Sequence, residues 1–142
     1  MFDQLHKYKE NDNFFLTPET ELESQCNAPK DKSGVFLVVE LKYGRIEMVY
    51  IGSTEIKDME ESTPGEIPSL FDTIVHGLQF ENQRKISYKQ KLIEEKVDGY
   101  DIYWYVTIND TIKDSPTMVK EKILKYYKSI YGKLPRWNRV QL

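Results

Sequence analysis

Two apolar runs around a tight turn constrain the fold of this chain more than any other feature. Residues 35–39 read Val-Phe-Leu-Val-Val, residues 46–51 resume the apolar pattern, and Tyr43-Gly44 stands between them. β-branched and aromatic residues on both sides of a glycine-containing turn are typical of a β-hairpin. Because the first run is apolar at successive positions, the hairpin is expected to belong to a sheet buried by helices rather than to one open to water.

Helical segments and one further strand follow the hairpin. Apolar residues recur at helical spacing in residues 69–78 and 86–97, and residues 100–108 are aromatic or β-branched almost throughout. A last helix is expected to begin at the capping pair Ser115-Pro116 and to end at Gly132. This order predicts an α+β domain with a small antiparallel three-stranded sheet that contains the hairpin and is flanked by helices.

The N-terminal segment differs from the rest of the chain. Residues 1–33 mix acids, asparagine and proline without a sustained hydrophobic period, and they are interpreted as an N-terminal arm before a domain spanning 34–142. With 142 residues, the chain is too short for two domains of average size. After Gly52, the polar stretch with Pro64 and Pro68 predicts a loop of about fifteen residues.

Cysteine and apolar content exclude several classes of protein. Cys26 is the only cysteine, so the chain can form neither an internal disulfide nor a multi-cysteine zinc site. No run of about 18 apolar residues is present, and the first residues lack the basic-then-apolar layout of a secretory signal. A cytoplasmic protein without a membrane partner is therefore expected.

Charge is distributed unevenly along the sequence. Residues 1–83 carry 16 acids and 7 bases, whereas residues 84–142 carry 7 acids and 13 bases. The segment 113–142 alone holds eight lysines and arginines against two acids. Such a basic segment is a candidate contact for phosphate, and a solvated lysine-rich helix face is the alternative that stays open.

Several short motifs occur in a recognisable order. The two hairpin strands read Gly34-Val35-Phe36 and Tyr50-Ile51-Gly52-Ser53, a helix and an acidic residue on a later helix follow, and the chain then reads Leu134-Pro135-Arg136-Trp137-Asn138. Over residues 34–138 this arrangement resembles the GIY-YIG nuclease superfamily. The resemblance implies an endonuclease, a hydrolase that cuts phosphodiesters of nucleic acid with one divalent metal ion, Mg²⁺ or Mn²⁺, and with DNA as the expected partner.

The resemblance also implies roles for individual residues. Tyr50 corresponds to the motif tyrosine, His76 lies on the first helix, and Glu121 would be the metal ligand. A carboxylate oxygen suits a hard divalent cation, and a guanidinium can stabilise the negative charge that develops on a phosphate. The residues expected to contact nucleic acid or to brace the site are Arg84, Lys125, Arg136 and Asn138.

Two positions depart from the superfamily pattern. Phe36 stands where a tyrosine is expected, and Thr73 stands where the catalytic arginine is expected. Loss of one preorganised transition-state donor costs on the order of 10² to 10³ in rate, so impaired hydrolysis is predicted unless another residue such as Arg84 reaches the site. A catalytically inactive domain that binds nucleic acid or protein on the same fold is the open alternative.

Overall fold

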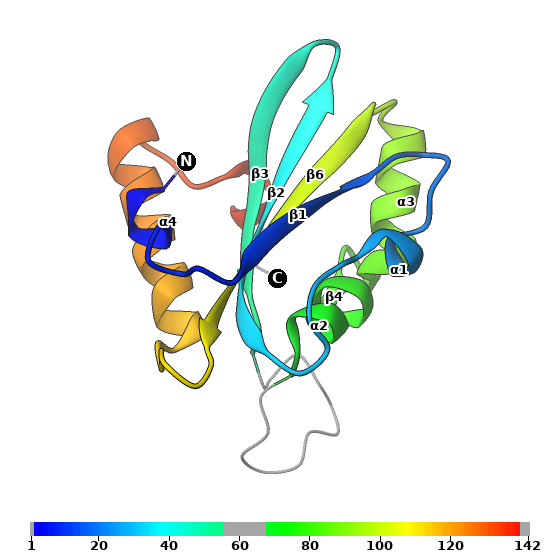
Figure 1. The fold of residues 1–142 in the computed structure, drawn as a ribbon. Coiled ribbons are helices and arrows are strands. Elements are labelled where there is room, and N and C mark those ends of the chain that lie inside the picture. Colours follow the sequence, from blue (N-terminus) through cyan, green and yellow to red (C-terminus); the bar gives the residue numbers. More distant parts are fainter. Residues whose placement is uncertain (1, 56–67, 140–142) are drawn as a thin grey trace.

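A four-stranded antiparallel sheet forms the centre of the computed structural model, which describes residues 2–55 and 68–139 (Figure 1). Across the sheet the strands lie in the order β1 (Asn11–Leu16), β6 (Gly99–Ile108), β2 (Ser33–Lys42) and β3 (Arg45–Ser53). The α+β class with an antiparallel sheet and flanking helices is confirmed. The expected number of three strands is wrong, because β1 pairs with β6 as a fourth strand.

The additional strand comes from the segment that was expected to be an N-terminal arm. β1 is an edge strand, and only Phe14 and Leu16 are buried while Asn11, Asp12 and Asn13 are exposed. An edge strand so short has too few buried positions to produce a period of two in the sequence. The same segment holds the short helices η1 (Asp3–Leu5) and α1 (Leu22–Gln25).

The predicted hairpin is confirmed in β2 and β3. Tyr43 and Gly44 connect the two strands with φ angles of 52° and 74°. A two-residue turn with positive φ at both positions matches the right-handed twist of its strands, and glycine adopts that conformation without steric cost. The predicted loop after Gly52 falls mainly on residues 56–67, which lie outside the described residues.

Three helices cover one face of the sheet. α1, α2 (Leu70–His76) and α3 (Arg84–Glu94) lie on this side, and the short strands β4 (Leu78–Gln79) and β5 (Asn82–Gln83) connect α2 to α3 (Figure 1). Their apolar side chains pack with the sheet in one core cluster that includes Phe36, Ile74, Tyr88, Leu92 and Ile102. Alternate residues of β6 such as Tyr100, Ile102 and Trp104 thus fill this core.

The last helix covers the opposite face. α4 (Pro116–Tyr131) packs Val119 and Ile123 against Leu37 and Ile51 in a second core cluster, which η1 also joins (Figure 1). The Ser115 hydroxyl caps its first turn, and Gly132 ends it in the left-handed region. The chain continues into η3 (Arg136–Asn138), which contacts β3. In the described part of the chain, no helix combines the length and apolar content needed to cross a membrane.

Candidate functional site

Arg84 lies at the centre of a polar cluster on the face of the sheet that α2 and α3 cover. Arg84 is the first residue of α3, and it is only 3% exposed. Nη1 donates a hydrogen bond to the carbonyl oxygen of Thr73 at 2.6 Å, and Nε donates to Oε1 of Gln79 at 2.9 Å. Nη2 donates to the Tyr50 hydroxyl at 3.4 Å. One guanidinium therefore joins α2, β4 and β3.

Aromatic rings replace a counter-ion around this arginine. Its Cζ atom lies 5.0 Å from the centroid of the Phe36 ring and 5.6 Å from that of the Tyr50 ring. No carboxylate among the described residues forms an ion pair with Arg84. A buried charge needs hydrogen bonds or counter-charges to offset its lost hydration, and here the ring faces and three neutral oxygens supply that stabilisation.

Both positions that depart from the superfamily pattern touch this guanidinium. Phe36 offers the face of its ring, and Thr73 offers its backbone carbonyl. The Thr73 hydroxyl is buried and has no hydrogen-bond partner among the described residues. A guanidinium thus lies beside Thr73 and Tyr50, but it comes from the start of α3, eleven residues beyond Thr73 in the sequence.

Two glycines leave the room that the cluster needs. A Cβ atom at Gly52 would lie 2.5 Å from the Phe36 ring, and one at Gly77 would lie 2.2 Å from Nη1 of Arg84. Distances below 3.0 Å would force a shift of the ring or of the guanidinium. The Tyr-Ile-Gly motif therefore has a packing reason in this chain, because its glycine accommodates the ring that contacts Arg84.

Gln79 holds the guanidinium in its orientation. Its Oε1 accepts hydrogen bonds from Nε of Arg84 and, at 2.8 Å, from the Tyr88 hydroxyl. Burial raises the pKa of Tyr88, so this phenol stays a protonated donor at neutral pH. Phe80 and Glu81 form the two-residue turn that follows Gln79, and both have positive φ.

His76 contacts residues other than those of the arginine cluster. Its Nδ1 lies 3.2 Å from Oε1 of Gln83, and its Nε2 lies 3.8 Å from a carboxylate oxygen of Glu23 in the segment of α1. The side chain is half-buried at the end of α2. The structure therefore brings Tyr50 together with Arg84 and engages His76 with a different pair of residues.

Glu121 and Tyr50 lie on opposite sides of the sheet. Glu121 is exposed on α4, whereas Tyr50 packs against the core cluster under α2 and α3. The described residues contain no group of three or more His, Cys, Asp or Glu side chains that could hold a metal ion. The ion that the resemblance implies would need Glu121 beside Tyr50, and these two residues do not come together, so no catalytic step is assigned to a metal ion. Lys125 is exposed on the same helix as Glu121.

Arg136 and Asn138 attach the end of the chain to the sheet. The Asn138 amide accepts a hydrogen bond from the Ile51 N–H at 2.9 Å and donates one to the Ile51 carbonyl at 3.0 Å. Nη2 of Arg136 donates to Oε1 of the buried Glu40 at 3.0 Å. Asn138 therefore braces the residue next to Tyr50, and Arg136 is bound within the molecule.

Gln79 and Glu40 are the polar residues that sequence reasoning missed. Glu40 follows five apolar residues of β2 and is only 5% exposed. An acid at the end of such a run was a signal, because a buried carboxylate needs a cationic or hydrogen-bonding partner. Gln79 carried no comparable signal, since its role depends on a short hairpin whose turn contains neither glycine nor asparagine.

The cluster positions the phenol of Tyr50. Tyr50 is half-buried at its edge, and its hydroxyl accepts a hydrogen bond from a guanidinium.

No family model, no curated protein and no solved structure matches this chain. The likeness to the nuclease superfamily therefore rests on the motifs and on their order.

Proposed function

We propose that this chain is a nucleic-acid-binding domain on a GIY-YIG-like scaffold and that it binds without cutting. The enclosure of Arg84 carries this proposal. A guanidinium that stabilises a phosphate in the transition state must present its donors to that phosphate. Arg84 is 3% exposed, and three of its five N–H groups donate to Thr73, Gln79 and Tyr50.

The position of the acidic residue supports the same proposal. One-metal hydrolysis requires a carboxylate, the metal-bound water and the activating group to meet at one phosphate. Glu121 lies on α4, which packs on one face of the sheet, whereas the Tyr50 side chain packs with the core cluster on the other face. The sheet therefore lies between the two side chains that the reaction would have to combine.

A basic surface on α4 supports nucleic acid as the partner. Lys122, Lys125 and Lys128 are exposed along this helix, whose one acid is Glu121. Phosphate contacts by lysine supply most of the sequence-independent affinity for nucleic acid through release of counterions. The basic half of the sequence places lysines on both α3 and α4. Those of α3 form ion pairs, Lys85 with Glu23, Lys89 with Glu21 and Lys91 with Glu95, so α4 is the helix whose exposed lysines are available for phosphate.

Salt-dependent binding tests the proposal. Fluorescence anisotropy with a labelled 20-base-pair duplex and a labelled single strand should show an affinity that falls steeply with salt. The double variant Lys125→Gln with Lys128→Gln should bind duplex more weakly, and its log-log salt slope should be shallower by about 1.8, because each phosphate contact contributes roughly 0.9. As a control, Lys30→Gln with Lys96→Gln removes two exposed lysines from the α1 and α3 side and should leave binding unchanged.

An affinity for neither duplex nor single strand at low salt would contradict nucleic-acid binding. Equal losses of affinity in the two double variants would contradict the assignment of the binding surface to α4. Thermal midpoints of all variants should agree with that of the wild type, because these lysines are exposed.

The contact between Arg84 and Tyr50 favours a second candidate function, metal-dependent hydrolysis. Nicking of supercoiled plasmid in the presence of Mn²⁺ tests it, with Tyr50→Phe and Glu121→Gln as variants. Nicking by the wild type that Tyr50→Phe abolishes would overturn binding without cutting. If the proposal holds, neither the wild type nor the variants produce metal-dependent nicks above the buffer control.

A further inference from the structure

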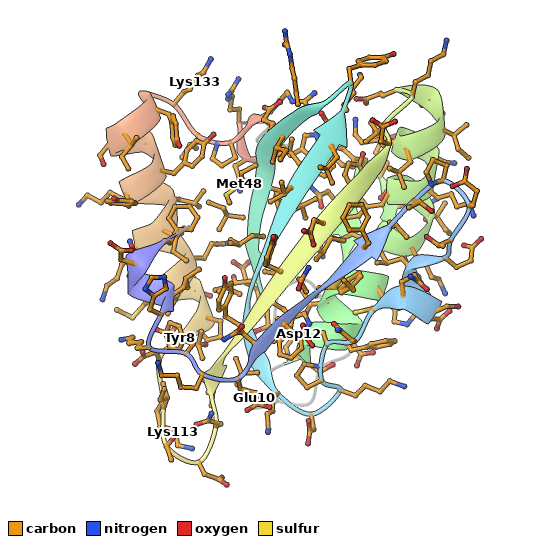
Figure 2. The ribbon with its side chains drawn as sticks, turned by 45° about the horizontal axis from the view of Figure 1, so that its top comes forward. Tyr8, Glu10, Asp12, Met48, Lys113 and Lys133 are labelled. Atoms are coloured by element: carbon orange, nitrogen blue, oxygen red, sulfur yellow. The ribbon has the colours of Figure 1, made fainter. Side chains whose placement is uncertain are left out.

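A pocket of about 340 Å³ lies where the N-terminal segment meets the beginning of α4. Its lining comes from three parts of the chain: the residues around η1, the connection between β6 and α4, and the first turns of α4. Figure 2 shows Tyr8 and Lys113 at this end of the molecule. The pocket is on the α4 side of the sheet and therefore does not include Arg84 or Tyr50.

The pocket has an excess of positive charge. Lys7, Lys113 and Lys122 line it, and Asp114 is the acid among the lining residues. Oδ2 of Asp114 accepts a hydrogen bond from the Tyr8 hydroxyl at 2.7 Å and pairs with Nζ of Lys7 at 3.0 Å. These two hydrogen bonds hold the pKa of the Asp114 carboxyl below its usual value, so this acid stays ionised and paired with Lys7.

Two lysines remain after that pairing. Lys113 donates to the backbone carbonyl of Asn109, an interaction that leaves its charge unbalanced. Lys122 forms no hydrogen bond or ion pair with the described residues, and its charge contributes less than Tyr8 and Lys7 to the lowered pKa of Asp114. An ammonium is a compact donor that binds phosphate as a point charge, and two of them match the charge of a phosphate monoester dianion.

The remaining walls limit the size of a ligand. Tyr8 and Val119 are buried and form apolar wall surface, and a volume of about 340 Å³ is near the lower end of small-molecule pockets. We infer that this pocket binds a phosphate monoester on a group of about nucleotide size. The ligand is either a free nucleotide or the terminal phosphate of a nucleic-acid strand.

The position of Lys122 relates the pocket to the proposed function. This lysine lines the pocket and also precedes Lys125 and Lys128 on the exposed face of α4. A strand that lies along α4 would bring its terminal phosphate to the pocket. The strand-end form of the inference rests on the proposed function, whereas the free-nucleotide form does not.

Two measurements on the full chain test the inference. Calorimetric titration with adenosine monophosphate, with adenosine and inorganic phosphate as controls, reports on the pocket alone. Anisotropy with ten-nucleotide strands that carry a 5′ phosphate, a 3′ phosphate or no terminal phosphate reports on strand ends. The pocket variant is Lys113→Gln with Lys122→Gln, and the matched control is Lys30→Gln with Lys96→Gln, which removes two exposed lysines from the α1 and α3 side of the sheet.

We expect the wild type to bind adenosine monophosphate at least tenfold more tightly than adenosine, and the pocket variant to lose this difference while the control keeps it. A tenfold preference for one phosphorylated strand, lost in the pocket variant alone, identifies a strand end as the ligand. Nucleotide binding without that preference identifies a free phosphate monoester.

Other outcomes separate the pocket inference from the proposed function, because each can fail while the other stands. If strands bind with salt dependence but terminal phosphate and adenosine monophosphate have no effect, the pocket assignment is wrong and nucleic-acid binding stands. If adenosine monophosphate binds but no strand does, the proposed function is wrong and the pocket stands. If the control variant loses the phosphate preference as fully as the pocket variant, the effect belongs to general charge and the pocket assignment is again wrong.

Discussion

At the scale of single residues, Arg84 distinguishes a structural cation from a ligand-binding one. Its donors are shared among a backbone carbonyl, an amide oxygen and a phenol, and the rings of Phe36 and Tyr50 lie beside it. The planar fork of arginine matches these three acceptors, and the ammonium of lysine has neither that shape nor the same reach. Substitution at this position should therefore act on folding before it acts on any ligand.

We predict that Arg84→Lys lowers the free energy of unfolding by about 2 to 4 kcal/mol, because buried acceptors at Thr73 and Gln79 lose charge-assisted donors. Urea unfolding followed by circular dichroism measures this loss, and Lys85→Gln, at the next position of α3, serves as the control. An Arg84→Lys protein as stable as the wild type would show that these contacts contribute little to folding and that the guanidinium is held for another purpose.

At the scale of elements, the short helix η3 protects the edge of the sheet. β3, like β1, is an edge strand, and edge strands with unpaired backbone groups are templates for pairing with other chains. The Asn138 side chain satisfies both the N–H and the carbonyl of Ile51, as a neighbouring strand would. Trp137 is buried beside it, with its ring centroid 5.3 Å from that of Tyr100.

Asn138→Ala should therefore reduce stability by about 1 to 3 kcal/mol, because two backbone groups of β3 lose their partners. It should also increase self-association through the exposed edge, which light scattering at rising protein concentration can follow. Arg139→Gln, whose side chain is exposed one residue further on, is the control. A monomeric Asn138→Ala protein of unchanged stability would show that water replaces the amide without loss.

The elements also show how far sequence reasoning extends. The hairpin, the helix expected within residues 69–78, the aromatic strand and the capped last helix each carry their signal within about fifteen residues, and all of them form, the first helix as Leu70–His76. β1 was missed because its pairing with β6 depends on residues far along the chain. The candidate site was predicted in part for the same reason. Tyr50 and Arg84 meet, but no local pattern fixes the side of the sheet on which α4 and Glu121 lie.

At the scale of the whole molecule, buried phenols make stability depend on alkaline pH. Burial is the main cause that raises the pKa values of Tyr8, Tyr88 and Tyr100 above that of a free tyrosine. A tyrosine whose pKa is higher in the folded protein than in the unfolded chain favours unfolding at alkaline pH, because only the unfolded chain then releases the proton easily. The stability is therefore complete below the pKa of the unfolded chain, about 10, and it decreases as the pH rises above that value.

The thermal midpoint should therefore stay nearly constant from about pH 7 to 9 and fall above about pH 10. Tyrosinate absorbance should show that some of the ten tyrosines ionise only on unfolding. Tyr100→Phe should flatten the decline, because it removes a buried hydroxyl that has no hydrogen-bond partner among the described residues. Ionisation of every tyrosine in one step, with the circular dichroism of the folded protein retained, would contradict this prediction.

The pairing of β1 with β6 affects the order in which the protein can fold during synthesis. Asn11 lies opposite Tyr105, and the central strand β6 separates β1 from the β2 and β3 hairpin. On a ribosome that adds roughly 5 to 20 residues per second, the first strand has no partner for on the order of ten seconds. The hairpin meanwhile exposes apolar side chains on both faces. A nascent chain stalled before residue 99 should consequently bind chaperones, and one released after α4 should not.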